Sequence, residues 1–236
     1  MPLAMARKRG LVDLLEALVE DEDEAVRLVR AVPELARSRV SEGRFFEEVP
    51  HWVYVGDTAL HLAAAALKPA GVEALLRAGA DPNAENRRGA LALHYACDPR
   101  PGSGKTWDPA RQRRVIELLL DAGSKIEHRE KAGAAPLHRA VRARSAEAVR
   151  CLLERGARVD ARHGKQRSSP LHLALHSTGA SGTKGARAEQ EEIVALLLEH
   201  GANPRAKDAR GKTPPLGERK HGRDRLRSTP RRGRAD

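Results

Sequence analysis

Aromatic residues are scarce in this chain of 236 residues: they make up 3% of it, with two each of Trp, Tyr and Phe. A hydrophobic core must therefore be built mainly from Leu, Val and Ala, a composition that suits closely packed short helices. Cysteine is equally scarce, and the two residues Cys97 and Cys151 do not suggest a disulfide framework. This cysteine usage favours a reducing compartment, and we expect a cytoplasmic protein.

Long apolar runs are also missing. No stretch approaches the roughly 20 apolar residues of a membrane span, so we expect no membrane association. Asp13 and Glu16 interrupt the apolar stretch 11–18, which argues against a secretory signal peptide. The net charge of +11 is concentrated near the C-terminus, where residues 205–236 hold 12 Lys or Arg against 4 Asp or Glu. The basic character therefore belongs mainly to this tail.

What the chain does contain is an internal repeat. Each unit has a Leu-His pair and, further along, a Gly that follows two leucines. The distance from His to Gly alternates between 18 and 29 residues, and the next His follows the Gly after 15 or 16 residues. The base period is therefore 33 residues, with 11 extra residues in the second and the fourth unit, and these insertions fall within 98–111 and 177–187. The histidines are His61, His94, His138 and His172, and the glycines are Gly79, Gly123, Gly156 and Gly201.

The residues before each Gly predict a helix. In the first unit Val72, Leu75 and Leu76 stand at i, i+3 and i+4, which places them on one helical face, and the other units repeat this pattern. A Gly directly after such a stretch is typical of a helix end, because it adopts a left-handed conformation at little cost.

These four copies resemble the ankyrin repeat family. The resemblance covers about 56 to 214 and implies an all-α solenoid of helix-turn-helix units with projecting hairpin-like loops. Because one unit cannot bury its own apolar face, neighbouring units stack. In the family the His hydrogen-bonds the neighbouring loop backbone, so the four histidines are interpreted as structural. The implied organisation is a divergent cap with the first projecting loop at 1–55, four repeats and the start of a degenerate fifth at 56–215, and a basic, disordered tail at 216–236. The repeats are placed at about 56–88, 89–132, 133–166 and 167–210.

The N-terminal segment precedes the first clear repeat. Residues 10–38 predict two short helices that act as a cap, and 39–55 supply the first projecting loop. We expect Phe45 and Phe46 in the core. If the chain is extended there, Trp52 and Tyr54 share one side, either as interface anchors or as packing over the cap.

One position of the repeat departs from the family's Thr-Pro-Leu-His pattern. Thr58 keeps the helix-capping hydroxyl, whereas Leu91 and Ala135 lack it. Since losing such a cap costs on the order of 1 kcal/mol, we predict that Leu91→Thr and Ala135→Thr raise thermal stability.

Catalytic and metal-binding motifs are weak. The segment 102–106 resembles a phosphate-binding loop, but Pro99 stands where that loop needs its first Gly. The histidines outside the repeats have no ligand spacing, and no nucleophile is paired with a base. We therefore expect no catalytic residues, no metal, no cofactor and no enzyme activity.

The sequence thus predicts a monomeric protein-interaction module that binds a partner protein through its concave face and projecting loops. The net basic loops favour an acidic partner surface. The alternative is nucleic-acid or other polyanion association through the basic tail. The two insertions either build a binding face or are tolerated surface loops. The residues predicted to contact the partner are Trp52, Arg87, Arg88, Tyr95, Arg129 and Arg162.

Overall fold

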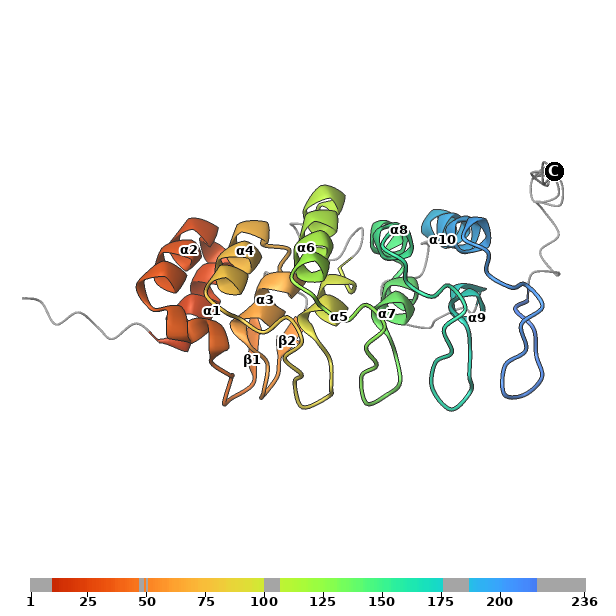
Figure 1. The fold of residues 1–236 in the computed structure, drawn as a ribbon, viewed down its shortest axis with the longest axis horizontal. Coiled ribbons are helices and arrows are strands. Elements are labelled where there is room, and N and C mark those ends of the chain that lie inside the picture. Colours follow the sequence, from red (N-terminus) through yellow and green to blue (C-terminus); the bar gives the residue numbers. More distant parts are fainter. Residues whose placement is uncertain (1–9, 47–48, 50, 100–106, 176–186, 216–236) are drawn as a thin grey trace, which may run out of the picture.

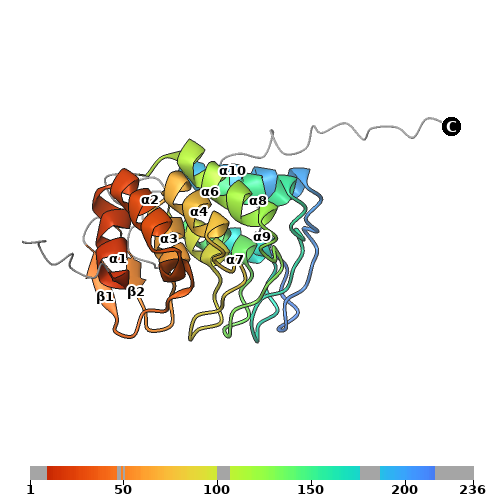
Figure 2. The same cartoon turned by 60° about the vertical axis from the view of Figure 1, so that its left-hand side comes forward.

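Paired helices stacked side by side form the body of the molecule (Figure 1). The computed structural model describes residues 10–46, 49, 51–99, 107–175 and 187–215. The first helices of the pairs form one layer and the second helices another, and hairpin loops project from one edge of the stack (Figures 1 and 2). This is the predicted solenoid. The first helices are α1 (Leu11–Glu20), α3 (Ala59–Ala65), α5 (Ala92–Ala96), α7 (Pro136–Ala143) and α9 (Pro170–Leu175), and the second helices are α2 (Glu22–Ala31), α4 (Pro69–Arg77), α6 (Pro109–Asp121), α8 (Ala146–Glu154) and α10 (Arg187–Glu199).

Helices α1 and α2 confirm the two helices predicted at the N-terminus. The Asp21 carboxylate caps α2 by accepting a hydrogen bond from the Glu24 amide at 3.0 Å. Glu22 in turn accepts hydrogen bonds from the amides of Ala70 and Gly71, at 2.8 and 3.1 Å, and so caps the start of α4. This pair is therefore bound to the first full repeat through its backbone as well as through apolar packing.

The segment predicted as the first of the projecting, hairpin-like loops contains a short β-hairpin. After a 3-10 turn at Pro33–Arg37, strand β1 (Arg44–Phe46) pairs antiparallel with β2 (His51–Val53). Phe45 lies opposite Trp52, and its side chain is 52% exposed. The expectation that Phe45 belongs to the core is therefore wrong, because alternation along the strand turns Phe46, and not Phe45, toward the core.

The four repeated histidines connect neighbouring units. In each, Nδ1 accepts a hydrogen bond from the backbone amide at the start of its own helix, as at Thr58 for His61 (3.2 Å). The Nε2 atom donates to a backbone carbonyl of the following loop. The family's expected hydrogen bond to the neighbouring loop is thus confirmed. The acceptors are Ala90 for His61, Ala134 for His94, Ala161 for His138 and Lys212 for His172, at 2.9 to 3.2 Å.

The predicted helix ends are also observed. Gly79 follows α4 with φ of 86°, and the equivalent glycines have φ between 84° and 88°. The amides of Gly79 and Ala80 donate to the carbonyls of Leu76 and Leu75, which satisfies the last turn of the helix. Only glycine adopts this left-handed conformation without strain, so the residue that gives the repeat its period also ends its second helix.

Both insertions follow the first helix of their unit, as the spacing predicts, and their last residues, 109–111 and 187, already belong to the second helix. Part of the added length extends the second helix, because α6 and α10 have 13 residues whereas α4 and α8 have 9. Each extended helix carries a glutamine at its fourth position. Gln112 donates to the Ala96 carbonyl at 2.9 Å and Gln190 to the Ala174 carbonyl at 2.7 Å, so each binds the end of its own first helix. Residues 100–106 and 176–186 lie outside the described residues.

Among the described residues, no helix combines the length and the apolar character that crossing a bilayer requires.

Candidate interaction surface

Three of the six predicted contact residues gather around the β-hairpin. Trp52 is 52% exposed, and its ring centroid lies 5.5 Å from that of Phe45. Arg88 and Arg87 are exposed on the next loop and lie over the Tyr54 ring, with 4.3 and 5.5 Å between the guanidinium carbon and the ring centroid. We call these five residues the hairpin patch. It combines an exposed aromatic pair with two cations that stack on a third aromatic ring.

The local sequence explains why these side chains face outward. Val53 in β2 is 2% exposed, so its neighbours Trp52 and Tyr54 share the opposite face of the strand. The side-chain oxygen of Asn86 accepts hydrogen bonds from the amides of Arg88 and Ala90, at 2.8 and 3.0 Å. These hydrogen bonds fix the backbone of the loop and therefore the position from which the two stacked arginine side chains extend.

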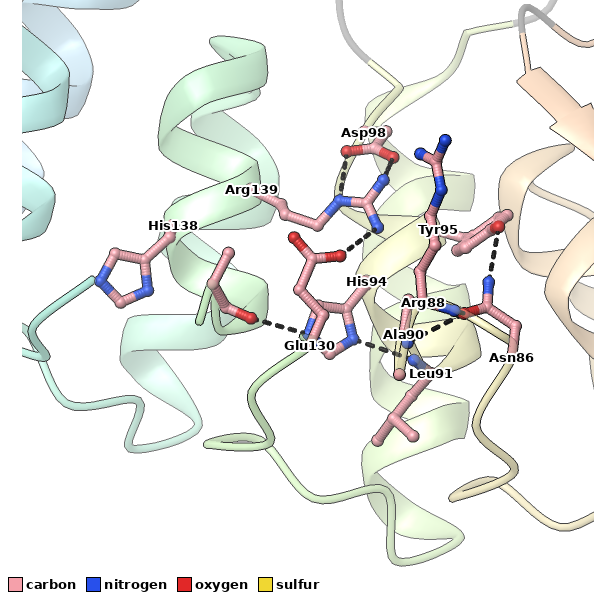
Figure 3. A network of polar contacts seen from close by, with 12 residues as sticks. Asn86, Arg88, Ala90, Leu91, His94, Tyr95, Asp98, Glu130, His138 and Arg139 are labelled. Carbon is pink, nitrogen blue, oxygen red and sulfur yellow. Dashed lines mark hydrogen bonds and ion pairs between the residues drawn. The ribbon is translucent and has the colours of Figure 1, made fainter. Parts of the chain in front are cut away.

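Tyr95 does not belong to this surface. Its side chain is 3% exposed, and its hydroxyl donates to the Asp57 carboxylate at 3.1 Å. The same hydroxyl accepts from the Asn86 side-chain amide at 2.9 Å (Figure 3). Burial, followed by the nearby Asp57 charge, raises the pKa of Tyr95. The prediction that Tyr95 contacts a partner is therefore wrong. Its ring packs edge-on against His61 of the preceding first helix, and Arg139 of the following first helix lies over it.

The neighbouring part of the first-helix layer is occupied by internal ion pairs. Arg139 of α7 donates to Asp98, with 3.0 Å between Nε and Oδ1, and lies 3.6 Å from Glu130 (Figure 3). Its guanidinium carbon is also 5.4 Å from the centroid of the Tyr95 ring. These charges neutralise one another within the fold, so this region offers a partner little unpaired charge.

Arg129 and Arg162 have a role inside the solenoid that the sequence did not reveal. Arg129 donates to the carbonyl of Arg162, and Arg162 donates to the carbonyl of Lys207 at 2.9 Å. Arg39 makes the same bond to the Glu85 carbonyl at 2.7 Å. Arg129 and Arg162 thus each bind the carbonyl at the equivalent position of the next loop, and their 33-residue spacing was the signal in the sequence, although Glu85 and Lys207 occupy this position in the other two loops. Arg129 remains exposed and Arg162 half-exposed.

The cysteines are placed as small core residues. Cys97 and Cys151 are both buried, and burial raises the pKa of Cys97 well above its usual range and that of Cys151 to about 11. Thiols of this kind are poor nucleophiles. Within the described ranges, no group of three or more His, Cys, Asp or Glu side chains is arranged to hold a metal ion. The segment 102–106 lies outside those ranges.

Comparison with known proteins agrees with this architecture. The profile described as "Ankyrin repeats (3 copies)" matches residues 110–208, and the profile "Ankyrin repeat" matches residues 55–87. Human B-cell lymphoma 3 protein is 36% identical over 124 residues, which are 52% of this chain and 26% of the relative. The chicken nuclear factor NF-kappa-B p105 subunit is 33% identical over 50% of this chain and 11% of its own length.

Human ankyrin repeat and SOCS box protein 16 is 29% identical over 169 residues, which are 70% of this chain and 33% of the relative. The chain thus matches between about a tenth and a third of the length of these relatives. The matched profiles, the 33-residue period and the stacked helix pairs lead to one conclusion: the chain belongs to the ankyrin repeat family.

Proposed function

We propose that this chain is a non-catalytic protein-interaction module that binds a partner protein through its projecting loops, with the hairpin patch as the main apolar contact. The observation that carries the proposal is the concentration of exposed apolar side chains. Of the four large exposed hydrophobic residues in the described chain, Phe45, Trp52 and Val55 belong to this hairpin, and only Val12 lies elsewhere.

The chemistry of the patch supports this choice. Trp, Tyr and Arg are the residues that most often dominate the energetics of protein interfaces. Here Trp52 packs on Phe45, and Arg88 stacks on Tyr54, so the side chains are ordered before a partner arrives. Such preorganisation lowers the entropy that binding costs. The concave part of the proposed contact is reduced, because Tyr95 is buried and Arg139 is paired internally.

Membership of the ankyrin repeat family supports binding rather than chemistry, and a fold alone does not specify a partner. The matched relatives are longer proteins, so their own partners are not transferred to this chain. A cytoplasmic location and a monomeric state remain predictions from the sequence.

Site-specific crosslinking tests the proposal. A photoreactive phenylalanine analogue replaces Trp52 in one variant and the exposed Arg30 of α2 in a control, and both are irradiated in the source cells. We expect a discrete adduct from position 52 that is lost when Arg88→Glu is added, with no such adduct from position 30. Equal adducts from both positions, or none from position 52, would contradict a contact at the hairpin patch.

A further inference from the structure

The projecting loops carry a line of cations that runs the length of the solenoid. We call the loop tips at 85–90, 127–134, 160–168 and 205–213 the loop row; they project from the same edge of the stack (Figure 1). Every one of the following side chains belongs to an exposed residue. They are Arg87, Arg88, Lys131, Lys165, Arg167, Lys207, Arg210 and Lys212.

The carboxylates of the loop row are largely used inside the fold. Glu127 accepts a hydrogen bond from the Arg158 amide at 2.7 Å, and Asp160 accepts one from the Asn203 amide at 3.2 Å. Asp208 accepts from the amide of Lys212 at 2.9 Å. These acids connect successive loops or close turns and keep their negative charge, but they are outnumbered, because the loop row holds 11 Lys or Arg against 5 Asp or Glu.

Cations on the second-helix layer behave differently from those of the loop row. Arg113 lies 3.2 Å from Glu147 and 2.6 Å from Glu154, and Arg150 lies 2.6 Å from Glu192. Within the described chain, by contrast, none of the eight loop-row cations has a carboxylate oxygen within 4.0 Å. Ion pairs thus offset several cations of the helix face, whereas the eight loop-row cations have no carboxylate beside them, an arrangement that attracts a negatively charged ligand.

We infer that an acidic, extended polypeptide segment of the partner lies along the loop row, with an apolar or aromatic side chain seated on the hairpin patch. This inference rests on the proposed function and adds the charge and the conformation of the bound segment. A row of loop tips presents its cations one after another, which suits a chain that advances about 3.3 Å per residue better than a folded surface.

The distribution of aromatic rings favours a polypeptide over a single-stranded nucleic acid. Proteins that bind single strands generally provide aromatic rings on which successive bases stack. In the described loops beyond the hairpin patch, from Lys131 to Lys212, no aromatic residue of the Phe, Tyr or Trp type accompanies the cations. The apolar contact is thus limited to one end of the row, as an acidic segment with a single anchor requires.

The inference is tested with the full chain and a displayed library of random 16-residue peptides. Peptides enriched by the wild-type protein are sequenced, and the most enriched one is synthesised for affinity measurements in 0.1 M salt. Two double variants have the same net charge: Lys131→Glu with Lys165→Glu on the loop row, and Arg30→Glu with Arg114→Glu on the helices. All four side chains belong to exposed residues, and the tail is unchanged in both variants.

We expect enrichment of Asp and Glu together with a Trp, Phe or Leu near one end of the peptide. The loop-row variant should bind the synthetic peptide about tenfold more weakly, and the helix variant within about twofold of wild type, because charge reversal acts mainly at the contact. Circular dichroism confirms that both variants are folded.

Three results would overturn the inference. The first is enrichment of neutral or basic peptides, or of none. The second is an equal loss of affinity in both variants, which would assign binding to overall charge or to the tail. The third is a single-stranded oligonucleotide that binds more tightly than the peptide with the same dependence on Lys131 and Lys165. If position 52 still crosslinks to a partner in any of these cases, the proposed function stands without this inference.

Discussion

The hydroxyl of Ser145 donates a hydrogen bond to the side-chain oxygen of Gln112, 3.0 Å away and in the preceding repeat. Gln112 is fully buried, and its amide nitrogen donates to the carbonyls of Ala96 and Pro99, at 2.9 and 2.8 Å. Trp107 donates to the same side-chain oxygen at 3.2 Å. One glutamine therefore connects both ends of the first insertion to the next repeat.

Gln112→Ala should consequently lower the free energy of unfolding by about 2–3 kcal/mol, because it leaves several buried polar groups without a partner. Urea denaturation followed by circular dichroism measures this loss. Arg114→Ala, at an exposed position of the same helix, serves as the control and should change stability by less than about 0.5 kcal/mol. Equal effects of the two substitutions would show that Gln112 is not a structural tether.

Tyr95→Phe separates the structural and the binding interpretations of Tyr95. The substitution removes the hydroxyl that donates to the fully buried Asp57 but keeps the ring beside Arg139. We expect a loss of about 1–2 kcal/mol in the free energy of unfolding, typical of a buried hydrogen bond to a charged group. Partner crosslinking from position 52 should be unchanged. Loss of crosslinking in a variant that keeps wild-type stability would restore Tyr95 to the contact surface.

The two substitutions that introduce a capping threonine are expected to have opposite effects on stability. The Thr58 hydroxyl contacts His61 Nδ1 at 3.0 Å and makes no bond to a helix amide, whereas the Ser169 hydroxyl at the equivalent position accepts from the His172 amide at 3.4 Å. Ala135 stands at this position before α7, so Ala135→Thr should stabilise the protein by about 0.5–1 kcal/mol. Leu91 occupies the same position before α5 but is fully buried, and its replacement by Thr removes apolar volume. This loss, of about 2 kcal/mol or more, outweighs a cap, so the sequence-based expectation for Leu91→Thr is replaced by destabilisation. Differential scanning calorimetry measures the melting temperature of both variants. A higher melting temperature for Leu91→Thr than for the wild type would contradict this account.

Stability should fall in mild acid because of the buried histidines. Burial lowers the pKa of His94 to about 3 and that of His138 to about 4, and it also lowers the pKa of His61. The unfolded chain therefore binds more protons than the folded one between these values and the ordinary value near 6.5. The contribution of these neutral, buried histidines to the free energy of unfolding is fully present above about pH 6.5 and is lost as the pH falls toward 4.

For each such histidine, the free energy of unfolding should decrease by about 1.4 kcal/mol for each pH unit between pH 6 and pH 5. Urea denaturation at several pH values measures the slope, and His138→Gln should reduce it by one such increment. A wild-type free energy of unfolding that stays constant from pH 7 to pH 5 would contradict the assignment.

The fold was accessible from the sequence because its determinants are local and recur. Gly79 ends a helix through its own backbone conformation, and His61 binds its own helix start, so the spacing of such residues carries the architecture. The contact residues were less accessible. The burial of Tyr95 depends on Asp57, 38 residues earlier in the chain, and the guanidinium of Arg129 binds a loop carbonyl 33 residues later. The exposure of Phe45 depends on the pairing of β1 with β2, and a strand of three residues is too short for its alternation to be recognised in the sequence.

The hydrogen bonds that the repeated histidines and the loop arginines donate between repeats run toward the C-terminus, and this direction sets where a stable fragment of the protein can end. The last histidine, His172, donates to the carbonyl of Lys212, and Arg162 donates to that of Lys207. Neither acceptor belongs to a helix. An expression boundary drawn directly after α10 would remove both acceptors and expose the final repeat, whereas a boundary at Pro215 retains them. Residues 205–215 thus supply the acceptors of the last described repeat without forming a helix of their own.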